Sequence, residues 1–322
     1  MLSRRHWLTT VMAAGLATLL FTGAAHAQDG KPTLRIVVPY AAGGATDALA
    51  RLLAPRLSKE LAQHVVVENR AGASGQIGTA AVKAAQPDGN TFLLSIDHAV
   101  VVVPLITPTA GYDALKDFTP VGQVARFQWT FAVPVTSPAK TLTEFVDHIR
   151  KHPADANYGV PLHGGVPDII GTAIDRKSGV LLQPVPFSGS AAVMPQLISG
   201  QIAAGVTGEA EGVAMARGGK LRILAVSGTS RSALLPDVPT FEELGFPGVN
   251  VNSFTAFFAP RGLPQAQAER FNAALRKVLA DDSVKAKIAD MPMHLAPTDL
   301  EGAKRELTAS YAFWNDPKRS KP

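Results

Sequence analysis

The stretch LRIVVPYAAGGATDALARLLAPRLSKEL, residues 34–61, decides the fold class of this chain. Its apolar start, LRIVVPY, predicts a short buried strand, and the AAGG that follows predicts a tight turn. Thr46 is a good N-cap for a helix over 47–61, along which leucines recur at spacings of three and four and give one apolar face. Pro55 should bend this helix because it removes a backbone donor. Strand, glycine turn and helix together predict a βα unit.

The same alternation continues after this unit. Strands over 64–68 and 91–96 flank a helix over 75–85, so we expect a parallel sheet with right-handed crossovers and helices on both faces. A second α/β unit begins near a helix that Thr141 or Thr143 caps, and its elements are predicted at 143–151, 157–160, 167–178, 181–185, 191–199, 201–206 and 221–226.

The end of the chain predicts a return to the first unit. An extended segment over 252–259 is followed by helices over 264–280 and 300–314. Their apolar faces have no partner of their own, so we expect them to pack on the first lobe and make it discontinuous in sequence.

Composition excludes several classes of protein. The 322 residues are 46% hydrophobic and 18% charged, which is typical of a globular chain of two lobes rather than a disordered one. The net charge of +5 is spread without a basic block, so we expect no nucleic acid partner. Because cysteine is absent, disulfides, thiolate metal sites and thiol nucleophiles are excluded.

The start of the chain, residues 1–27, is predicted to be a secretory signal peptide. Arg4 and Arg5 precede an apolar run over 7–21, and the small-residue triplet at 25–27 predicts cleavage after Ala27. The run is shorter than the ~20 residues that a membrane span needs. Export by the general or the twin-arginine route stays open.

No catalytic motif, cofactor fingerprint or metal cluster stands out. The chain has no nucleophile elbow, zinc-protease motif, P-loop or dinucleotide glycine pattern, so we expect no enzyme, no cofactor and no metal. His148 and His152 lie four apart on a predicted helix, but their charged neighbours favour a solvated face. A secreted hydrolase that uses Asp97 with His98 or His163 remains the weaker alternative.

Glycine and small polar residues recur where predicted strands end. Such turns border the crevice of an open α/β sheet, where loop amides and helix N-termini favour anionic oxygens. In any one of these turns the glycines could simply allow a tight change of chain direction. Four such turns shared between two lobes, however, indicate a ligand cleft. They lie at 41–46, 72–75, 163–166 and 188–190, and the last contributes Gly189 and Ser190.

At these residues the sequence resembles the extracytoplasmic solute receptors of tripartite tricarboxylate transporters, the Bug receptors. The resemblance covers nearly the whole exported chain. It is carried by PYAAGGATD (39–47), VVVENRAGASGQIG (65–78), YDALKDFTPVG (112–122) and GKLRILAVSGTSRSALLPDVPTFEELGFPG (219–248).

The resemblance implies a fold and a role. The fold is an α/β two-lobe periplasmic binding protein, a type II-like Venus flytrap with mixed sheets flanked by helices. Lobe 1 would comprise residues 28–128 and 257–322 and lobe 2 residues 129–256, with a hinge in the two extended crossings. The chain would act in the periplasm as a monomer that passes a small carboxylate or amino acid-like ligand to membrane permease subunits. A sensor subunit that presents its ligand to a membrane signalling protein is the alternative.

The resemblance also implies ligand contacts. Two loops of the family grip the ligand through backbone groups and water, and their matching residues here are Tyr40, Ala41, Gly43, Gly44, Ser74 and Gly75. Asp47 lies in the first helical turn, where it either faces the ligand or only balances the helix dipole.

Several positions depart from the family pattern. The loop over 161–170 keeps Gly164 but has Gly165 for a serine and Asp168 for a histidine, and Thr207 stands for an aspartate. Asp97 and His98 follow the third strand, where small polar residues are usual. Either these carboxylates and that of Glu209 face solvent or loop amides, or the ligand carries a donor or cationic end opposite its own carboxylate.

Overall fold

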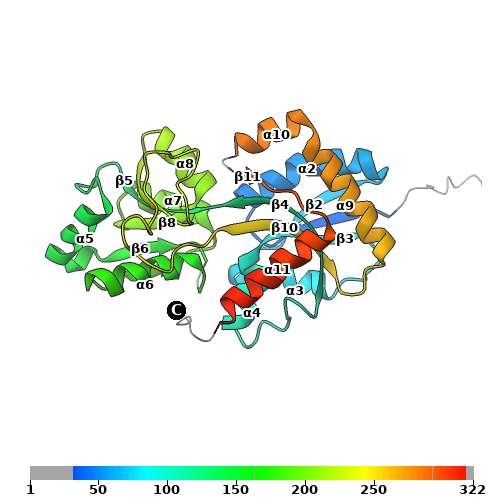
Figure 1. Ribbon diagram of the computed structural model, residues 1–322, viewed down its shortest axis with the longest axis horizontal. Coiled ribbons are helices and arrows are strands. Elements are labelled where there is room, and N and C mark those ends of the chain that lie inside the picture. Colours follow the sequence, from blue (N-terminus) through cyan, green and yellow to red (C-terminus); the bar gives the residue numbers. More distant parts are fainter. Residues whose placement is uncertain (1–31, 163, 292, 317–322) are drawn as a thin grey trace, which may run out of the picture. The chain divides into compact units, whose positions relative to one another are not determined.

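The computed structural model describes residues 32–162, 164–291 and 293–316, and the predicted leader lies outside these ranges. Two mixed β-sheets, each flanked by helices, form an α/β fold of two lobes (Figure 1). The first lobe is here the six-stranded sheet with its helices, and the second lobe is the five-stranded sheet with its helices. The predicted fold class is confirmed.

The first sheet has the strand order β11-β4-β10-β3-β1-β2. Its parallel part consists of β1, β2 and β3, as the alternation of strands and helices predicted. The late strand β10 enters between β3 and β4 and runs antiparallel to both. The bounds are β1 Leu34–Val38, β2 Val65–Asn69, β3 Thr91–Ile96, β4 Phe118–Phe127, β10 Ser253–Pro260 and β11 His294–Leu295.

The second sheet has the strand order β7-β6-β8-β5-β9. Strand β6 is parallel to β7 and β8, whereas β5 is antiparallel to β8 and β9. The bounds are β5 Trp129–Pro134, β6 Asn157–Val160, β7 Gln183–Pro186, β8 Ala204–Gly208 and β9 Leu221–Val226.

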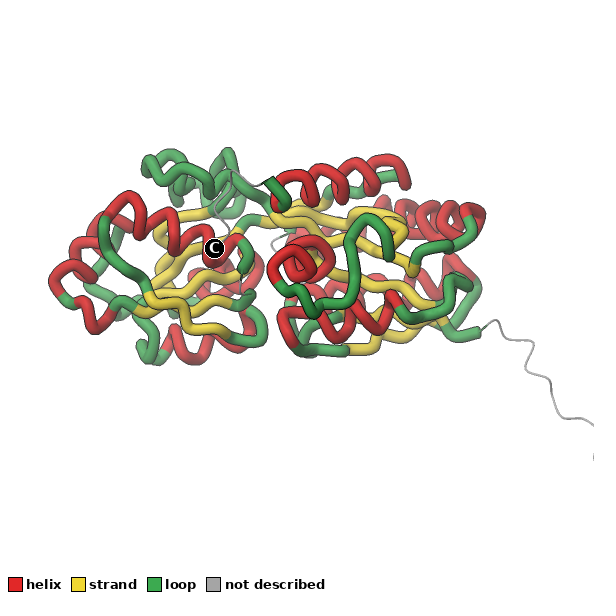
Figure 2. The backbone as a smooth tube through the Cα atoms, turned by 90° about the horizontal axis from the view of Figure 1, so that it is seen from below, coloured by secondary structure: helices red, strands yellow, loops and turns green. Residues whose placement is uncertain are grey.

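Helices cover both faces of each sheet, as Figure 2 also shows. On the first sheet α2, α9 and α10 pack on one face, whereas α3 and α11 share a second apolar cluster with the π-helical turn at His98–Val102. On the second sheet α5 and α6 share one cluster and α7 and α8 another. The bounds are α2 Ala45–Leu61, α3 Gln76–Lys83, α4 Val103–Ile106, α5 Leu142–Lys151, α6 Val166–Ser178, α7 Ser190–Ile198, α8 Glu209–Arg217, α9 Gln265–Ala280, α10 Asp282–Ala289 and α11 Leu300–Trp314.

The chain passes between the sheets at a single residue, Gln128, which separates β4 from β5. Its side chain is buried and donates to the carbonyls of Ser227 and Ser230, the latter at 2.8 Å. Its backbone exchanges hydrogen bonds with Glu209. The return passage ends where β10 begins at Ser253, ahead of the expected lobe boundary at 257. The crossing from β4 to β5 is therefore anchored to the second lobe.

Most predicted elements are confirmed within a few residues, with one correction at a helix start. Thr141 caps α5 by accepting from the Glu144 amide. Thr46, however, is not the N-cap of α2: the helix begins at Ala45 with Gly44 as its N-cap, and no side chain caps it. No helix in the described part of the chain is both long and apolar enough to cross a bilayer.

Candidate functional site

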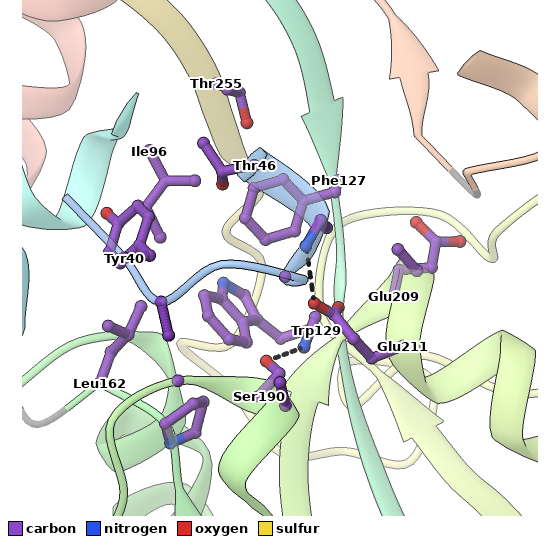
Figure 3. A pocket seen from close by; sticks show the side chains of 18 of the residues that line it. Tyr40, Thr46, Ile96, Phe127, Trp129, Leu162, Ser190, Glu209, Glu211 and Thr255 are labelled. Atoms are coloured by element: carbon purple, nitrogen blue, oxygen red, sulfur yellow. Dashed lines mark hydrogen bonds between the residues drawn. The ribbon is translucent and has the colours of Figure 1, made fainter. Parts of the chain in front are cut away.

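A cleft of about 680 Å³, partly open to solvent, is lined by residues from both lobes (Figure 3). The first lobe contributes the loop after β1, the first turn of α2 and the end of β3. The second lobe contributes the starts of β5, α7 and α8. The lining residues are Tyr40, Ala41, Gly44, Ala45, Thr46, Ile96, Phe127, Trp129, Pro161, Leu162, Ser188, Gly189, Ser190, Ala191, Gly208, Glu209, Ala210, Glu211, Thr255 and Met293.

Asp47 holds the loop after β1 in place. Its carboxylate accepts from the Gly43 amide at 2.9 Å, from Arg51 Nε at 3.0 Å and from Asn69 Nδ2 at 3.0 Å. Burial works to raise the pKa of Asp47, but these hydrogen bonds outweigh it and lower the pKa. Asp47 therefore remains ionised and engaged with its own lobe, which agrees with a structural role rather than a ligand contact.

Tyr40 lines the cleft and carries a buried, neutral hydroxyl. Its Oη lies 3.1 Å from Ser95 Oγ, and its carbonyl accepts from Asn69 Nδ2 at 3.2 Å. Burial raises the pKa of Tyr40 well above its usual range. The side chain is therefore a fixed hydrogen-bonding group and not a charge.

The walls of the cleft are largely apolar. Phe127 and Trp129 meet edge to face with ring centroids 5.4 Å apart, and Ile96 and Leu162 lie nearby in Figure 3. The Trp129 indole donates to Ser253 Oγ at 3.0 Å, which fixes the ring. Such walls suit the hydrocarbon or aromatic body of a ligand, whereas its polar ends must meet the loops.

The loops of the second lobe supply polar groups opposite α2. Ser190 Oγ accepts from the Gly208 amide at 3.0 Å, which joins the first turns of α7 and α8. Glu211 reaches further, because its Oε1 accepts from the Ala45 amide in the first lobe at 3.4 Å (Figure 3). The cleft is thus bridged by a carboxylate that belongs to the protein itself.

A neighbouring cavity of about 610 Å³, open in part to solvent, contains the second glycine loop. Residues 72–75, with Ser74 and Gly75, line this cavity and not the main cleft. The two cavities share Tyr40, Pro161, Leu162 and Ser188. The loop therefore lies next to the main cleft, separated from it by these shared residues.

Apart from Ser74 and Gly75, the predicted ligand contacts fall into two groups. Those that line the main cleft are Tyr40, Ala41, Gly44, Gly189 and Ser190. Gly43, Asp47, Asp97, His98, Gly164, Gly165, Asp168 and Thr207 line neither cavity.

Members of the second group contact other parts of the protein instead. Asp168 is buried, and its carboxylate accepts a hydrogen bond from the Gly164 amide. This contact matches the expectation that the carboxylate bonds a loop amide and not a cationic end of the ligand. Thr207 Oγ1 lies 2.8 Å from Thr130 Oγ1 inside the second lobe. His98 is buried, and a Cβ on Gly165 would approach its Nδ1 to 2.5 Å, which places the loop against the first lobe.

Sequence reasoning missed the apolar walls and Glu211 as cleft residues. The helix α8 was not predicted because it is short, with Gly212 in its interior. Its position right after β8 was the available signal, since residues that follow a strand end border the crevice.

Gly164→Ala should loosen the contact between the lobes. A Cβ at this position would clash with Ile106 Cδ1, and the backbone φ of +78° already disfavours a side chain. We expect Gly164→Ala to lower the free energy of unfolding by about 1–2 kcal/mol in urea titrations, because the backbone strain remains even where the end of the Ile106 side chain moves aside.

The matched control is Gly179→Ala, where φ is +72° and nothing lies within 4 Å of the added Cβ. It carries the backbone strain alone and should cost only about 1 kcal/mol. In a double-mutant cycle, Gly164→Ala should cost less in the Ile106→Ala background than in the wild type, because the close contact is then absent. Equal losses in both single variants would show that the loop does not press on Ile106.

Comparisons with known proteins agree with this architecture. The family model described as the tripartite tricarboxylate transporter family receptor matches residues 49–304. A UPF0065 protein of Bordetella bronchiseptica is 34% identical, over 88% of this chain and 84% of its own.

Solved structures show the same similarity. The periplasmic binding protein BugD is 28% identical with a TM-score of 0.81, over 88% of this chain and 95% of its own. Rpa4515 of R. palustris, solved with adipate, is 30% identical with a TM-score of 0.82, over 88% and 94% of the two chains.

Proposed function

Because this chain belongs to the tripartite tricarboxylate transporter receptor family, a family of solute-binding receptors, we propose that it captures a small carboxylate or amino acid-like ligand in the cleft. It would then pass the ligand to the membrane permease subunits of a transporter of that type. The observation that carries the proposal is the cleft itself, which has apolar walls and is lined by the first turns of helices from both lobes. Helix N-termini favour carboxylate oxygens.

Several finer points belong to the same proposal. We propose that the receptor works in the periplasm as a monomer after removal of the leader near Ala27. The expected boundary at 257 moves to Ser253, where β10 joins the first sheet, so its moving lobes would be residues 28–128 with 253–322, and residues 129–252. Of the predicted contacts, those that line the cleft are the proposed ligand contacts, with Ser74 and Gly75 close by.

The relatives suggest where to begin a ligand search. Rpa4515 was solved with adipate, a dicarboxylate. For this chain a library of monocarboxylates, dicarboxylates, amino acids and aromatic acids is the appropriate screen. At a concentration of about 100 times its dissociation constant, a ligand of the folded state raises the free energy of unfolding by about 2.7 kcal/mol.

A cognate ligand should change the emission of Trp129. The indole lines the cleft, is 2% exposed and lies next to the crossing at Gln128, so both contact and lobe closure alter its surroundings. We expect a saturable shift or quenching in fluorescence titrations, together with a smaller radius of gyration in solution scattering.

Trp129→Phe should abolish the fluorescence signal, and Trp314→Phe, in the last helix, should keep it. A library in which no acid stabilises the protein or changes its emission would contradict the proposed receptor function.

A further inference from the structure

One threonine interrupts the apolar surface that the first sheet presents to the cleft. The register of β10 places Thr255 directly opposite Ile96 on β3 and Ala125 on β4. Phe127 lies two residues further along β4, so its side chain is on the same face of the sheet as that of Ala125. Ile96, Phe127 and Thr255 all line the cleft. Of these three side chains, that of Thr255 is the polar one.

The hydroxyl of Thr255 has no hydrogen-bond partner among the described residues. The residue is completely buried, so bulk water does not reach this hydroxyl either. Figure 3 shows the hydroxyl directed away from β10, toward the side on which Phe127 lies. A buried polar group without a partner costs free energy, and proteins leave few such groups unpaired. A hydroxyl of this kind in the lining of a ligand cleft points to a partner that the ligand supplies.

The charges of the cleft decide which kind of group suits this position. Among the described lining residues, the charged ones are Glu209 and Glu211, and none is a lysine, arginine or histidine. A ligand carboxylate buried against Thr255 would therefore have no cationic side chain in the lining to offset its lost hydration. A neutral oxygen costs less to bury, and a threonine hydroxyl can donate to a carbonyl or exchange a hydrogen bond with another hydroxyl.

We propose that Thr255 is a specificity-determining residue whose hydroxyl binds a hydroxyl or carbonyl oxygen of the ligand. The cleft then selects a hydroxy or oxo acid over the same acid without that oxygen. Thr46, in the first turn of α2, contributes a second neutral hydroxyl to the lining. Because Thr255 is covered in this structure, the ligand oxygen reaches it when the lobes open, as the proposed hinge motion provides. This inference rests on the proposed receptor function and specifies the ligand class for the same cleft.

The experiment compares acids that differ by one neutral oxygen. Three series provide such comparisons: butanoate with its 2-, 3- and 4-hydroxy and 2-oxo forms, succinate with 2-hydroxysuccinate, and benzoate with its 3- and 4-hydroxy forms. Calorimetric titrations would use wild-type protein, Thr255→Val, Thr255→Ser and a control, Thr79→Val. The control removes an equally buried threonine hydroxyl from α3, at a position that lines neither cavity.

In the wild type we expect one hydroxy or oxo acid to bind about tenfold more tightly than its parent acid. Thr255→Val should reduce this ratio to about twofold or less, because the methyl group that replaces the hydroxyl cannot hydrogen-bond, and it should leave the affinity for the parent acid almost unchanged. Thr255→Ser should keep the preference, and Thr79→Val should leave all affinities unchanged. The thermal midpoint of Thr255→Val without ligand should equal or exceed that of the wild type, since the variant removes an unpaired buried hydroxyl.

Two results overturn the inference but leave the receptor function intact. In the first, acids bind but no hydroxy or oxo form binds more tightly than its parent. In the second, Thr255→Val weakens parent and oxygenated acids by the same factor, which shows that the side chain only shapes the cleft. Failure of every acid in these series and in the broader library to bind is a different outcome, since it removes the proposed receptor function and this inference together.

Discussion

Asp97→Asn should stabilise the protein at pH 8 by about 2–4 kcal/mol and have little effect at pH 4. Asp97 follows β3, is only 2% exposed and has a carboxylate oxygen, Oδ1, without a hydrogen-bond partner in the described structure. Burial raises its pKa to about 7, although hydrogen bonds from Ser253, Phe254 and His98 oppose the shift.

The direction of the pH dependence follows from that shift. Between the ordinary pKa near 3.9 and the folded-state pKa of about 7, the folded protein keeps a proton that the unfolded chain has lost. The contribution of Asp97 to stability is therefore complete at low pH and is lost as the pH rises to about 7. The change is at most about 1.4 kcal/mol for each pH unit.

Urea titrations between pH 4 and pH 8 measure this effect directly. Asp47→Asn is the control of opposite sign, because the pKa of Asp47 is lowered and its carboxylate stabilises the fold above its ordinary pKa. Since Ser253 connects Asp97 to the Trp129 indole, wild-type emission should also titrate near pH 7. If the Asp97→Asn variant is less stable than the wild type at pH 8, the raised pKa of Asp97 is contradicted.

Gly78→Ala should cost about 3 kcal/mol or more of unfolding free energy and weaken ligand binding. Gly78 lies in α3, where an added Cβ would be 2.8 Å from the Arg70 carbonyl oxygen and 2.8 Å from Pro39 Cα and Cβ. Backbone atoms cannot rotate away as side-chain ends can. The helix must move instead, and it would displace Pro39 and with it Tyr40 at the cleft.

Gly218→Ala is the matched control for this loss. Its φ is −76°, and the nearest atoms to an added Cβ are carbonyl oxygens at 3.5 and 3.6 Å. Chemical denaturation should show little change for this variant. A similarly small change for Gly78→Ala would mean that α3 can shift on the sheet without strain.

Much of the fold could be predicted because its elements carry their own local signals. The strands β3, β6 and β9 and the helix α11 were predicted with their observed bounds, since apolar runs and periodic faces between clear turns define them. The helix α10 was missed because Asp281 caps it directly after α9 ends, so no loop separates the two.

The candidate site was predictable only along its polar loops. Gly44, Gly189 and Ser190 follow or precede regular elements, and their position at strand ends is visible in the sequence. The walls formed by Phe127, Trp129 and Met293 depend on how two sheets meet, which no local pattern encodes. The same is true of Glu211, whose partner Ala45 is 166 positions away.

The place of β10 in the first sheet also orders the assembly of the molecule. All five strands of the second sheet come from one continuous stretch, residues 129–226, so that sheet has its full complement of strands before the rest of the chain is present. The first sheet does not, because β10 at 253–260 lies between β3 and β4 and hydrogen-bonds to both. Until the chain has emerged as far as Pro260, β3 and β4 keep open edges. The second sheet, from the middle of the chain, can therefore be completed before the first sheet, whose earliest strands come from the start of the chain.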